Sequence, residues 1–223
     1  MFNGTDVNLV EDINPSGFSI PSSLTVYKNN LYFKAEADSN LGRELYVYDG
    51  INVSLVSDIY PGSSDSTPNN LFIYDDKLYF IAYNNTGKNE LYSFNGSNLK
   101  LETLPTDPSL SNHILFNNKV YFSASNSSLG RELFSYDGNT FNLVSDIYPG
   151  TGSSYPENFL VKGNYLFFIA KNDTPNTYPF YMDTLEVVNN VYSNVSGWNT
   201  NPGYITGATF DNNVYFLEYS VYN

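Results

Sequence analysis

The sequence repeats itself about every 45 residues, and this period restricts the possible folds more than any other feature. The phrase "GRELYVYDG" at residues 42–50 returns as "GRELFSYDG" at residues 130–138. A second landmark, "LYF" or a close variant of it, starts at positions 31, 78, 120, 166 and 214, which gives steps of 47, 42, 46 and 48 residues. A unit of this length cannot bury its apolar surface alone, so neighbouring units are expected to pack against one another.

Each unit contains four short segments with the pattern of β-strands. In the first unit, residues 23–27 and 31–35 flank the turn "KNN", which predicts a hairpin because asparagine tolerates the positive φ of tight turns. Residues 44–48 and 52–62 supply the third and fourth segments. Apolar and aromatic side chains alternate onto both faces in "LYFKA" and "ELYVY". A four-stranded sheet with two such faces packs against a neighbour on each side, as the blade of a β-propeller does.

The sequence therefore predicts an all-β fold, a five-bladed β-propeller of about 45-residue repeats. We expect a single domain with repeats at approximately residues 1–50, 51–96, 97–138, 139–184 and 185–223. The last repeat offers only two strand segments, while "NLVEDI" (8–13) has the pattern of an isolated fourth strand. We expect this N-terminal strand to close the last blade, which would then be one strand short, at its third strand.

The recurring phrases resemble the bacterial ELWxxDGT repeat, and the resemblance covers nearly the whole chain. It rests on "GRELYVYDG", "KNELYSFNG" and "GRELFSYDG", and on the "LVSDIYPG" that follows the first and third of them. Tyr46, Tyr92 and Phe134 stand where the family has tryptophan. The strand and turn order is also similar to Kelch repeats. The resemblance implies a propeller-like, secreted or surface protein and no single activity.

The fourth repeat departs from this pattern. It has "YPFYMDT" where a phrase such as "ELYSFNG" is expected. Because proline cannot donate a hydrogen bond to a sheet ladder, Pro179 predicts an exposed edge strand in an irregular fourth blade.

Composition argues against several classes of function. The chain has 23 acidic against 10 basic residues and a net charge of −13, without a basic cluster, so neither nucleic acid nor an anionic membrane surface is an expected partner. No apolar run is long enough to insert into a membrane as a helix. With no cysteine, a single histidine at His113 and no paired carboxylates, the chain is expected to hold no cofactor and not to be an enzyme.

Glutamates recur at the head of the third segment of three repeats, at Glu44, Glu90 and Glu132, and arginines precede two of them. Residues that return in every unit usually serve the repeat. We therefore expect hydrogen bonds between blades, with Asp12, Asp58 or Asp146 of the "DIxP" turns as partners. The alternative is a symmetric set of ligand contacts.

Three aromatic residues are candidates for ligand binding. Tyr60 and Tyr148 belong to the "DIYPG" loops, where exposed rings could stack on sugar faces. Trp198 lies in a polar loop, "SNVSGWNTNPGY", and is either a plug over the core or a contact residue.

The loops are also compatible with calcium binding and with N-glycosylation. Oxygen ligands for calcium are offered by Asp58, Asp65 and Asp146, although ordinary turn chemistry explains these residues equally well and no metal site is expected. N-glycosylation sequons occur at Asn3, Asn52, Asn84, Asn95, Asn126, Asn172 and Asn194. They favour an extracellular or cell-surface location.

These features together predict a non-catalytic structural or adhesive module. A blade without its third strand leaves a place for one strand from another subunit, so we expect a homo-oligomer, or filaments built by strand completion. The alternative is a lectin, because loops rich in tyrosine and asparagine suit the recognition of glycans.

Overall fold

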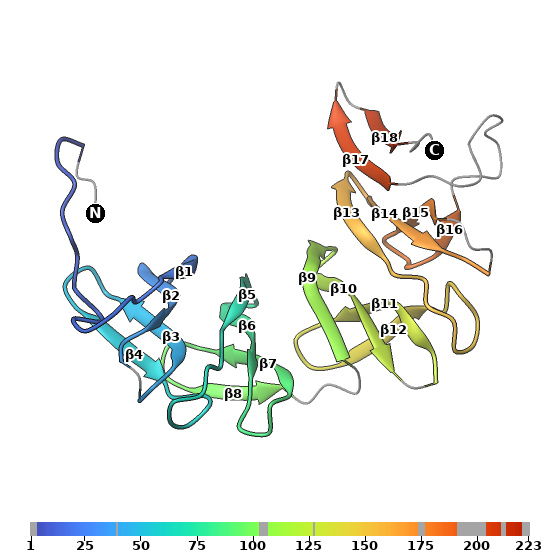
Figure 1. Cartoon of the computed structure of the whole chain (residues 1–223). Helices are drawn as coiled ribbons and strands as arrows, with labels where there is room; N and C mark the ends of the chain where they lie inside the picture. The colour runs from blue at the N-terminus through green and yellow to red at the C-terminus, as the bar shows by residue number, and fades with distance from the viewer. Residues whose placement is uncertain are drawn as a thin grey trace. The chain divides into compact units, whose positions relative to one another are not determined.

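The protein is all-β in a computed structural model (Figure 1). The structure describes residues 4–38, 40–102, 107–126, 128–173, 177–190, 204–210 and 213–219. No helix in these ranges could cross a membrane. The chain forms two compact units, Met1–Thr103 and Leu104–Asn223.

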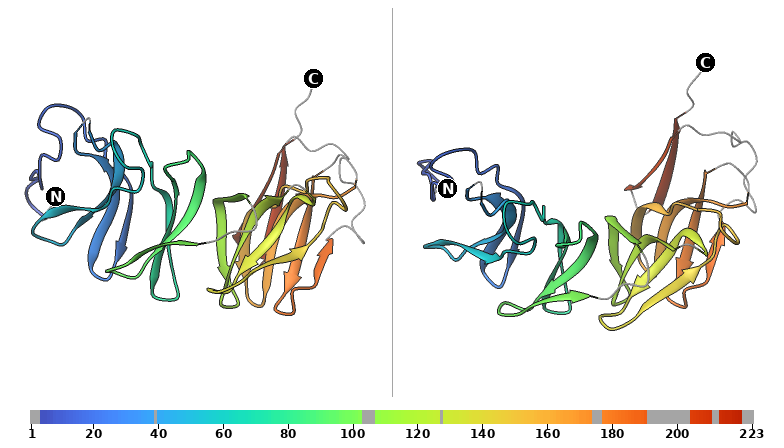
Figure 2. Two further views of the ribbon diagram at one scale, coloured as in Figure 1. Left: turned by 90° about the horizontal axis from the view of Figure 1, so that it is seen from below. Right: turned by 60° about the horizontal axis from the view of Figure 1, so that its bottom comes forward.

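The first unit contains two four-stranded antiparallel sheets, and consecutive strands are neighbours in both (Figures 1 and 2). The first sheet comprises β1 (Ser22–Tyr27), β2 (Asn30–Glu36), β3 (Arg43–Tyr48) and β4 (Val53–Ser57). The second sheet comprises β5 (Asn69–Tyr74), β6 (Lys77–Tyr83), β7 (Asn89–Phe94) and β8 (Leu99–Glu102).

The second unit repeats this plan. One sheet comprises β9 (Asp107–Phe116), β10 (Lys119–Asn126), β11 (Gly130–Tyr136) and β12 (Phe141–Ser145). The next comprises β13 (Glu157–Lys162), β14 (Tyr165–Lys171), β15 (Thr177–Asp183) and β16 (Val188–Asn190). A hairpin of β17 (Tyr204–Phe210) and β18 (Asn213–Tyr219) follows. The prediction of an all-β fold of four-stranded units is confirmed.

The turns form where the sequence predicts them. At the first hairpin, Lys28 and Asn29 have φ of 47° and 63°, which is the backbone of a two-residue turn that matches strand twist. In the "DG" turn, Asp49 Oδ1 accepts the N–H groups of Ile51 and Asn52 at 2.8 and 2.7 Å, so the aspartate fixes the turn by itself.

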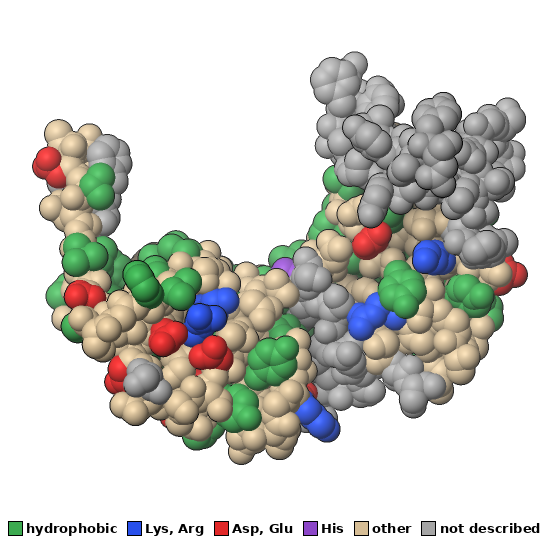
Figure 3. Space-filling view, in the orientation of Figure 1, with side chains coloured by type: hydrophobic (Ala, Val, Ile, Leu, Met, Phe, Trp, Pro, Cys, Tyr) green, Lys and Arg blue, Asp and Glu red, His purple; other side chains and the backbone are tan. Residues whose placement is uncertain are grey.

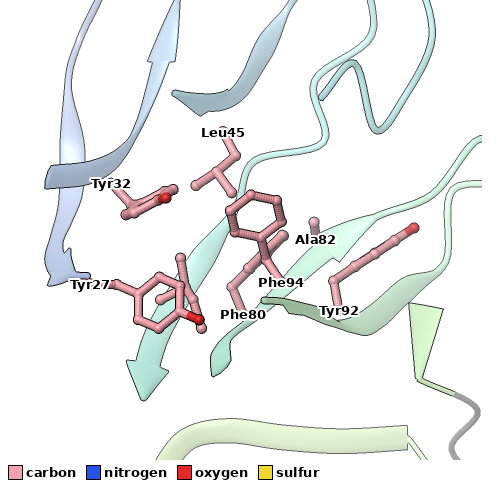
Figure 4. Close-up of a cluster of buried hydrophobic side chains, with 8 residues drawn as sticks. Tyr27, Tyr32, Leu45, Phe80, Ala82, Tyr92 and Phe94 are labelled. Carbon is pink, nitrogen blue, oxygen red and sulfur yellow. The ribbon is translucent and has the colours of Figure 1, made fainter. Parts of the chain in front are cut away.

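The core of the first unit lies between its two sheets. Tyr27, Tyr32 and Leu45 of the first sheet pack against Phe80 and other side chains of the second (Figure 4). The opposite face of the first sheet carries Phe33 and Tyr46, whose rings stack with centroids 6.3 Å apart. Each sheet thus has two apolar faces, as the alternation indicated. A comparable core in the second unit joins its two four-stranded sheets.

Two sequence-based expectations need correction. The segment 8–13 forms no ladder, and Val7 beside it forms only an isolated bridge. The strand that carries Pro179 is not an edge, because β15 pairs with β14 on one side and β16 on the other. Pro179 stands opposite Ile169 of β14, but β16 pairs only with residues Phe180–Met182, so no ladder bond on the β16 side requires an N–H at Pro179.

On the face of the described residues drawn in Figure 3, Lys and Arg side chains are scattered among Asp and Glu side chains and form no basic patch.

Candidate functional site

Glu44 on β3 joins the first sheet to the second. Its side chain is fully buried, and its carboxylate accepts the N–H groups of Ile59, Tyr60 and Ser66 at 2.9, 3.4 and 3.2 Å. It also accepts the Ser66 hydroxyl at 2.5 Å. Ser66 precedes β5, so this one side chain fixes both the loop that leaves the first sheet and the segment that enters the second. We call this arrangement a glutamate joint.

Glu132 on β11 forms a second glutamate joint with the same geometry. It accepts the N–H groups of Ile147, Tyr148 and Ser154 at 2.8, 3.5 and 3.1 Å, and the Ser154 hydroxyl at 2.6 Å. Ser154 precedes β13 in the same way as Ser66 precedes β5. Two joints that agree in every partner show that Glu44 and Glu132 serve the repeat, whereas Glu90 is only half-buried.

The expected partners of these glutamates were wrong. Asp58 and Asp146 do not bond to them; each accepts the N–H of its own loop glycine, Gly62 or Gly150, at 3.3 Å. The true partners are backbone N–H groups and a serine. A sequence signal for that serine existed, because "S-x-P" occurs before the first strand of several repeats, at residues 66–68 and 154–156 among others.

The recurring phrase needs glycine at its first position because another backbone segment passes very close to it. Gly42 and Gly130 have φ of 62° and 66°. A Cβ atom would lie 2.4 Å from the carbonyl oxygen of Ser64 at the first position, and 1.8 Å from that of Gly152 at the second. Only glycine allows the strand to start this near to the loop that its own glutamate holds.

Arg43 adds little to the joint. Its guanidinium lies 3.5 Å from the Glu36 carboxylate and 3.9 Å from that of Asp65, and these side chains are between 28% and 42% exposed. Ion pairs this open to solvent contribute about 0–1 kcal/mol. The stronger contact is the Asp65 carboxylate accepting the Arg43 backbone N–H at 2.8 Å.

Burial changes the acidity of both joint glutamates. Desolvation raises the pKa of Glu44 to about 7, against the opposing effect of hydrogen bonds from Ser66, Ile59 and Tyr60. Burial also raises the pKa of Glu132. The burial of each carboxylate thus favours its neutral form over the charged one.

This shift predicts that the first unit becomes less stable as pH rises. The pKa of Glu44 is higher in the folded state than its ordinary 4.5, so the folded state binds more protons between about pH 4.5 and 7. The free energy of unfolding should fall by about 3 kcal/mol across this window and then level off. Urea unfolding at several pH values would measure it. The variant Glu44→Gln should show a flatter profile, and an unchanged slope would contradict the assignment.

The aromatic ligand candidates differ in their surroundings. Tyr60 and Tyr148 are both half-buried, and each donates its backbone N–H to a joint glutamate. The Tyr148 ring lies against Gly152, where an added Cβ would be 2.0 Å from Tyr148 Cδ1. Trp198 lies outside the described residues. Sugar stacking by these side chains stays a prediction.

The calcium candidates are engaged in loop bonding. Asp58 and Asp146 bond to their turn glycines and Asp65 to Arg43, as given above. No group of three or more His, Cys, Asp or Glu side chains that could hold a metal ion occurs in the described ranges. Calcium binding stays a prediction.

The predicted glycosylation sites differ in accessibility. Among the described side chains, the exposed ones are Asn52 and Asn95 and the half-buried ones are Asn84 and Asn172. The remaining three lie outside the described side chains: Asn3, Asn126 and Asn194. Glycosylation stays a prediction.

A cavity of about 300 Å³ lies between the N-terminal segment and the outer face of the first sheet. The side chains that line it are Asn8, Leu9, Val10, Glu11, Ile13, Ser19, Pro21, Leu24, Leu31, Phe33, Tyr48 and Val53. Most of them are apolar, so the cavity suits a hydrophobic side chain better than a charged ligand.

Four-stranded antiparallel sheets that follow one another along the chain, joined by repeated buried glutamates, define a repeat protein of the propeller type. No protein-family model matches the sequence, and no curated protein does. Solved structures do match, and the ones described below are 8–13% identical to this chain.

A Mycobacterium tuberculosis puromycin-hydrolyzing peptidase is 13% identical with a TM-score of 0.55, over 82% of this chain and 31% of that one. The β-propeller domain of the Trilobed protease from Pyrococcus furiosus is 12% identical with a TM-score of 0.52, over 79% and 56%. The S511A mutant of puromycin hydrolase complexed with PGG is 10% identical with a TM-score of 0.56, over 93% and 34%. The chain thus spans less than two thirds of each of these proteins.

The prediction that the chain is not an enzyme is contradicted by these comparisons. Similar folds occur within a puromycin-hydrolyzing peptidase and a prolyl endopeptidase. The matched regions are only 31% and 24% of those chains. A propeller that lacks paired carboxylates, cysteine and all but one histidine therefore does not exclude an enzyme, because the reacting groups can lie elsewhere in a longer chain.

Proposed function

We propose that the chain is a structural and adhesive module of the cell surface, which holds another polypeptide at the outer face of its first sheet. The observation that supports this is a concentration of exposed apolar side chains there. Val7, Leu9 and Phe18 of the N-terminal segment are 82%, 81% and 85% exposed, and Leu24 and Val26 of β1 are 61% and 63% exposed. Apolar side chains also gather in this region on the face drawn in Figure 3.

Exposed apolar surface of this extent usually marks an interaction site. Within the first unit, the inner face of the first sheet is covered by the whole second sheet, whereas the outer face is covered by Ile13 and its neighbours in the N-terminal segment. A partner would remove the remaining apolar surface from water.

The number of five blades and the closure of the last blade by the N-terminal segment stay predictions, separate from this proposal. Assembly of copies into filaments and recognition of glycans stay predictions for the same molecule.

A photo-cross-linking amino acid at position 9 tests the proposed function in the natural host. Leu185 provides a matched control, because it is 79% exposed against 81% for Leu9 and lies in the other unit. Position 9 should cross-link reproducibly to one identified polypeptide and position 185 should not. Equal backgrounds at both positions would contradict the proposal, and cross-links to a second copy alone would favour filament assembly instead.

The comparisons favour a second candidate function, the propeller part of a hydrolase. The names of two matched proteins state that they hydrolyse puromycin. Assaying the natural full-length protein for release of the amino acid from puromycin tests this candidate. Absence of turnover, with the protein shown to be folded by circular dichroism, would remove it.

A further inference from the structure

The N-terminal segment repeats the sequence of the segments that take part in the glutamate joints. Residues 7–13 read "VNLVEDI", residues 53–59 read "VSLVSDI" and residues 141–147 read "FNLVSDI". The "S-x-P" element follows in each case, and at the N-terminus it occupies residues 19–21. By sequence, the segment therefore corresponds to the half of a third joint that donates hydrogen bonds to the glutamate.

The backbone of this segment already has the conformation found in the two complete joints. Ile20 has a φ of 43°, and its counterparts Thr67 and Tyr155 have φ of 44° and 50°. This region of φ is unfavourable for a β-branched residue such as isoleucine. Its retention at Ile20 shows that the fold imposes the joint conformation even without a glutamate.

The backbone bond that anchors each element to its sheet is also preserved. Ser19 accepts the N–H of Glu36 at 3.0 Å, and Ser66 accepts the N–H of Tyr83 at 2.8 Å. Glu36 and Tyr83 are the last residues of β2 and β6. Ser19 therefore lies in the first sheet where Ser66 lies in the second.

No glutamate among the described residues completes this third joint. Ser66 and Ser154 are fully buried under their glutamates, whereas Ser19 is half-buried. Within the described part of the chain, the Ser19 hydroxyl and the Ile13 N–H have no hydrogen-bond partner. At the complete joints these two groups are the ones closest to the carboxylate.

The cavity occupies the position that a leucine following the glutamate would take at the third joint, as Leu45 follows Glu44 at the first. At the complete joint, Leu45 follows Glu44 and packs in one cluster with Leu78 and Phe80 of the next sheet. Their counterparts one repeat earlier are Leu31 and Phe33, and both line the cavity of about 300 Å³. Its volume exceeds what one leucine side chain requires.

We infer that residues 7–24 and the outer face of the first sheet bind one extended strand of a partner polypeptide with the pattern Glu-Leu-aromatic. Its glutamate accepts the Ile13 N–H and the Ser19 N–H and hydroxyl, and its leucine fills the cavity. Its aromatic residue stands opposite Leu9, as Tyr46 of β3 stands opposite Leu55 of β4. This strand addition names the ligand of the proposed adhesive surface and so rests on that function.

The donor is a partner rather than a second copy of this chain. The strands that carry Glu44, Glu90 and Glu132 each lie between two paired neighbours, so none can be donated without unfolding its sheet. In the fourth repeat, Tyr178 stands opposite Ala170 where the other repeats have glutamate. An identical copy therefore offers no free strand of the required pattern.

A synthetic peptide provides the test. The acetylated and amidated nonapeptide "GRELYVYDG", labelled with a fluorophore, is titrated with the intact protein and followed by anisotropy. We expect saturable binding that protects residues 7–24 from hydrogen exchange. Replacing the peptide glutamate by alanine should weaken binding at least roughly tenfold, because the Ser19 and Ile13 donors lose their acceptor.

Matched protein variants locate the site. Ser19→Ala should weaken peptide binding about fivefold to tenfold, whereas Ser66→Ala, at a joint already filled by Glu44, should leave it unchanged. Equal binding of the parent, glutamate-free and scrambled peptides would overturn the inference. So would a protein that associates with its own copies and protects residues 7–24 without peptide. Peptide binding without any cross-linked host partner would refute the adhesive function and leave the strand site standing.

Discussion

Replacement of Gly130 by alanine is expected to lower the free energy of unfolding of the second unit by about 3 kcal/mol. The residue has a φ of 66°, a conformation that costs an alanine about 1 kcal/mol. In addition, the new Cβ would lie 1.8 Å from the carbonyl oxygen of Gly152, so backbone must move. That movement would pull the N–H groups of Ile147 and Ser154 away from the Glu132 carboxylate that accepts them. Urea unfolding followed by circular dichroism measures the effect.

Gly150 offers a control in the loop that Gly130 approaches. It has a φ of 84°, but no atom lies within 4 Å of the position that its Cβ would take. Gly150→Ala should therefore cost only the conformational term of about 1 kcal/mol. Similar losses for Gly130→Ala and Gly150→Ala would show that close approach is not what selects glycine at position 130.

Removal of a joint glutamate is the second change with a large expected effect. Glu44→Ala should lower the free energy of unfolding of the first unit by about 3 kcal/mol, because the buried N–H groups of Ile59 and Ser66 lose their acceptor and a void forms. Hydrogen exchange should rise in residues 58–67 before it rises in the strands. Urea unfolding combined with exchange measured by mass spectrometry would follow both.

The equivalent serines Ser66 and Ser19 test how much the bond between serine and glutamate contributes to stability. Ser66→Ala removes one hydroxyl bond to Glu44 and should cost about 1 kcal/mol. Ser19→Ala removes a hydroxyl that has no acceptor among the described residues and should change stability by less than about 0.5 kcal/mol. Equal costs at the two positions would mean that the joint does not depend on the serine–glutamate bond, and would also weaken the case for a strand site at Ser19.

These predictions assign a structural role to most of the recurring phrase "GRELYVYDG". Its first glycine permits the loop to pass close by, its glutamate holds that loop and the next sheet, and its leucine enters the core between sheets. Its "DG" closes a turn in which the Asp49 side chain accepts two backbone N–H groups. At Ile13 and Ser19 the equivalent hydrogen-bond donors are present, and no glutamate among the described residues accepts from them.

The sequence predicted the repeated sheets well because the signals are local. Strand alternation, aromatic and β-branched composition and the "NN" and "DG" turns each act within a few residues, and all of them recur in several units. The failure at Pro179 arose because proline excludes ladder bonds on one side at one position and does not determine whether a strand is an edge.

The candidate site was only partly accessible from sequence. Recurrence singled out Glu44 and Glu132 as parts of the repeat, but their partners were misassigned, because a carboxylate pairs with whichever donors the fold brings near. Those donors are backbone N–H groups, which every residue except proline carries and which therefore leave no mark in the sequence. The comparisons with peptidases likewise corrected the prediction, made from composition, that the chain is not an enzyme. That prediction considered only the residues of this chain.

The sequence by itself determined the all-β class, the period of about 45 residues, the two apolar faces of each sheet and the turns, because these follow from alternation and local backbone preference. Tertiary structure alone decided that a glutamate 22 residues before a serine becomes its partner, and that Gly42 and Gly130 must lack a side chain. It also decided that the Ser19 hydroxyl has no partner among the described residues. The physical reason is that burial, close approach and the pairing of hydrogen-bond donors depend on distances between segments that chain order does not specify.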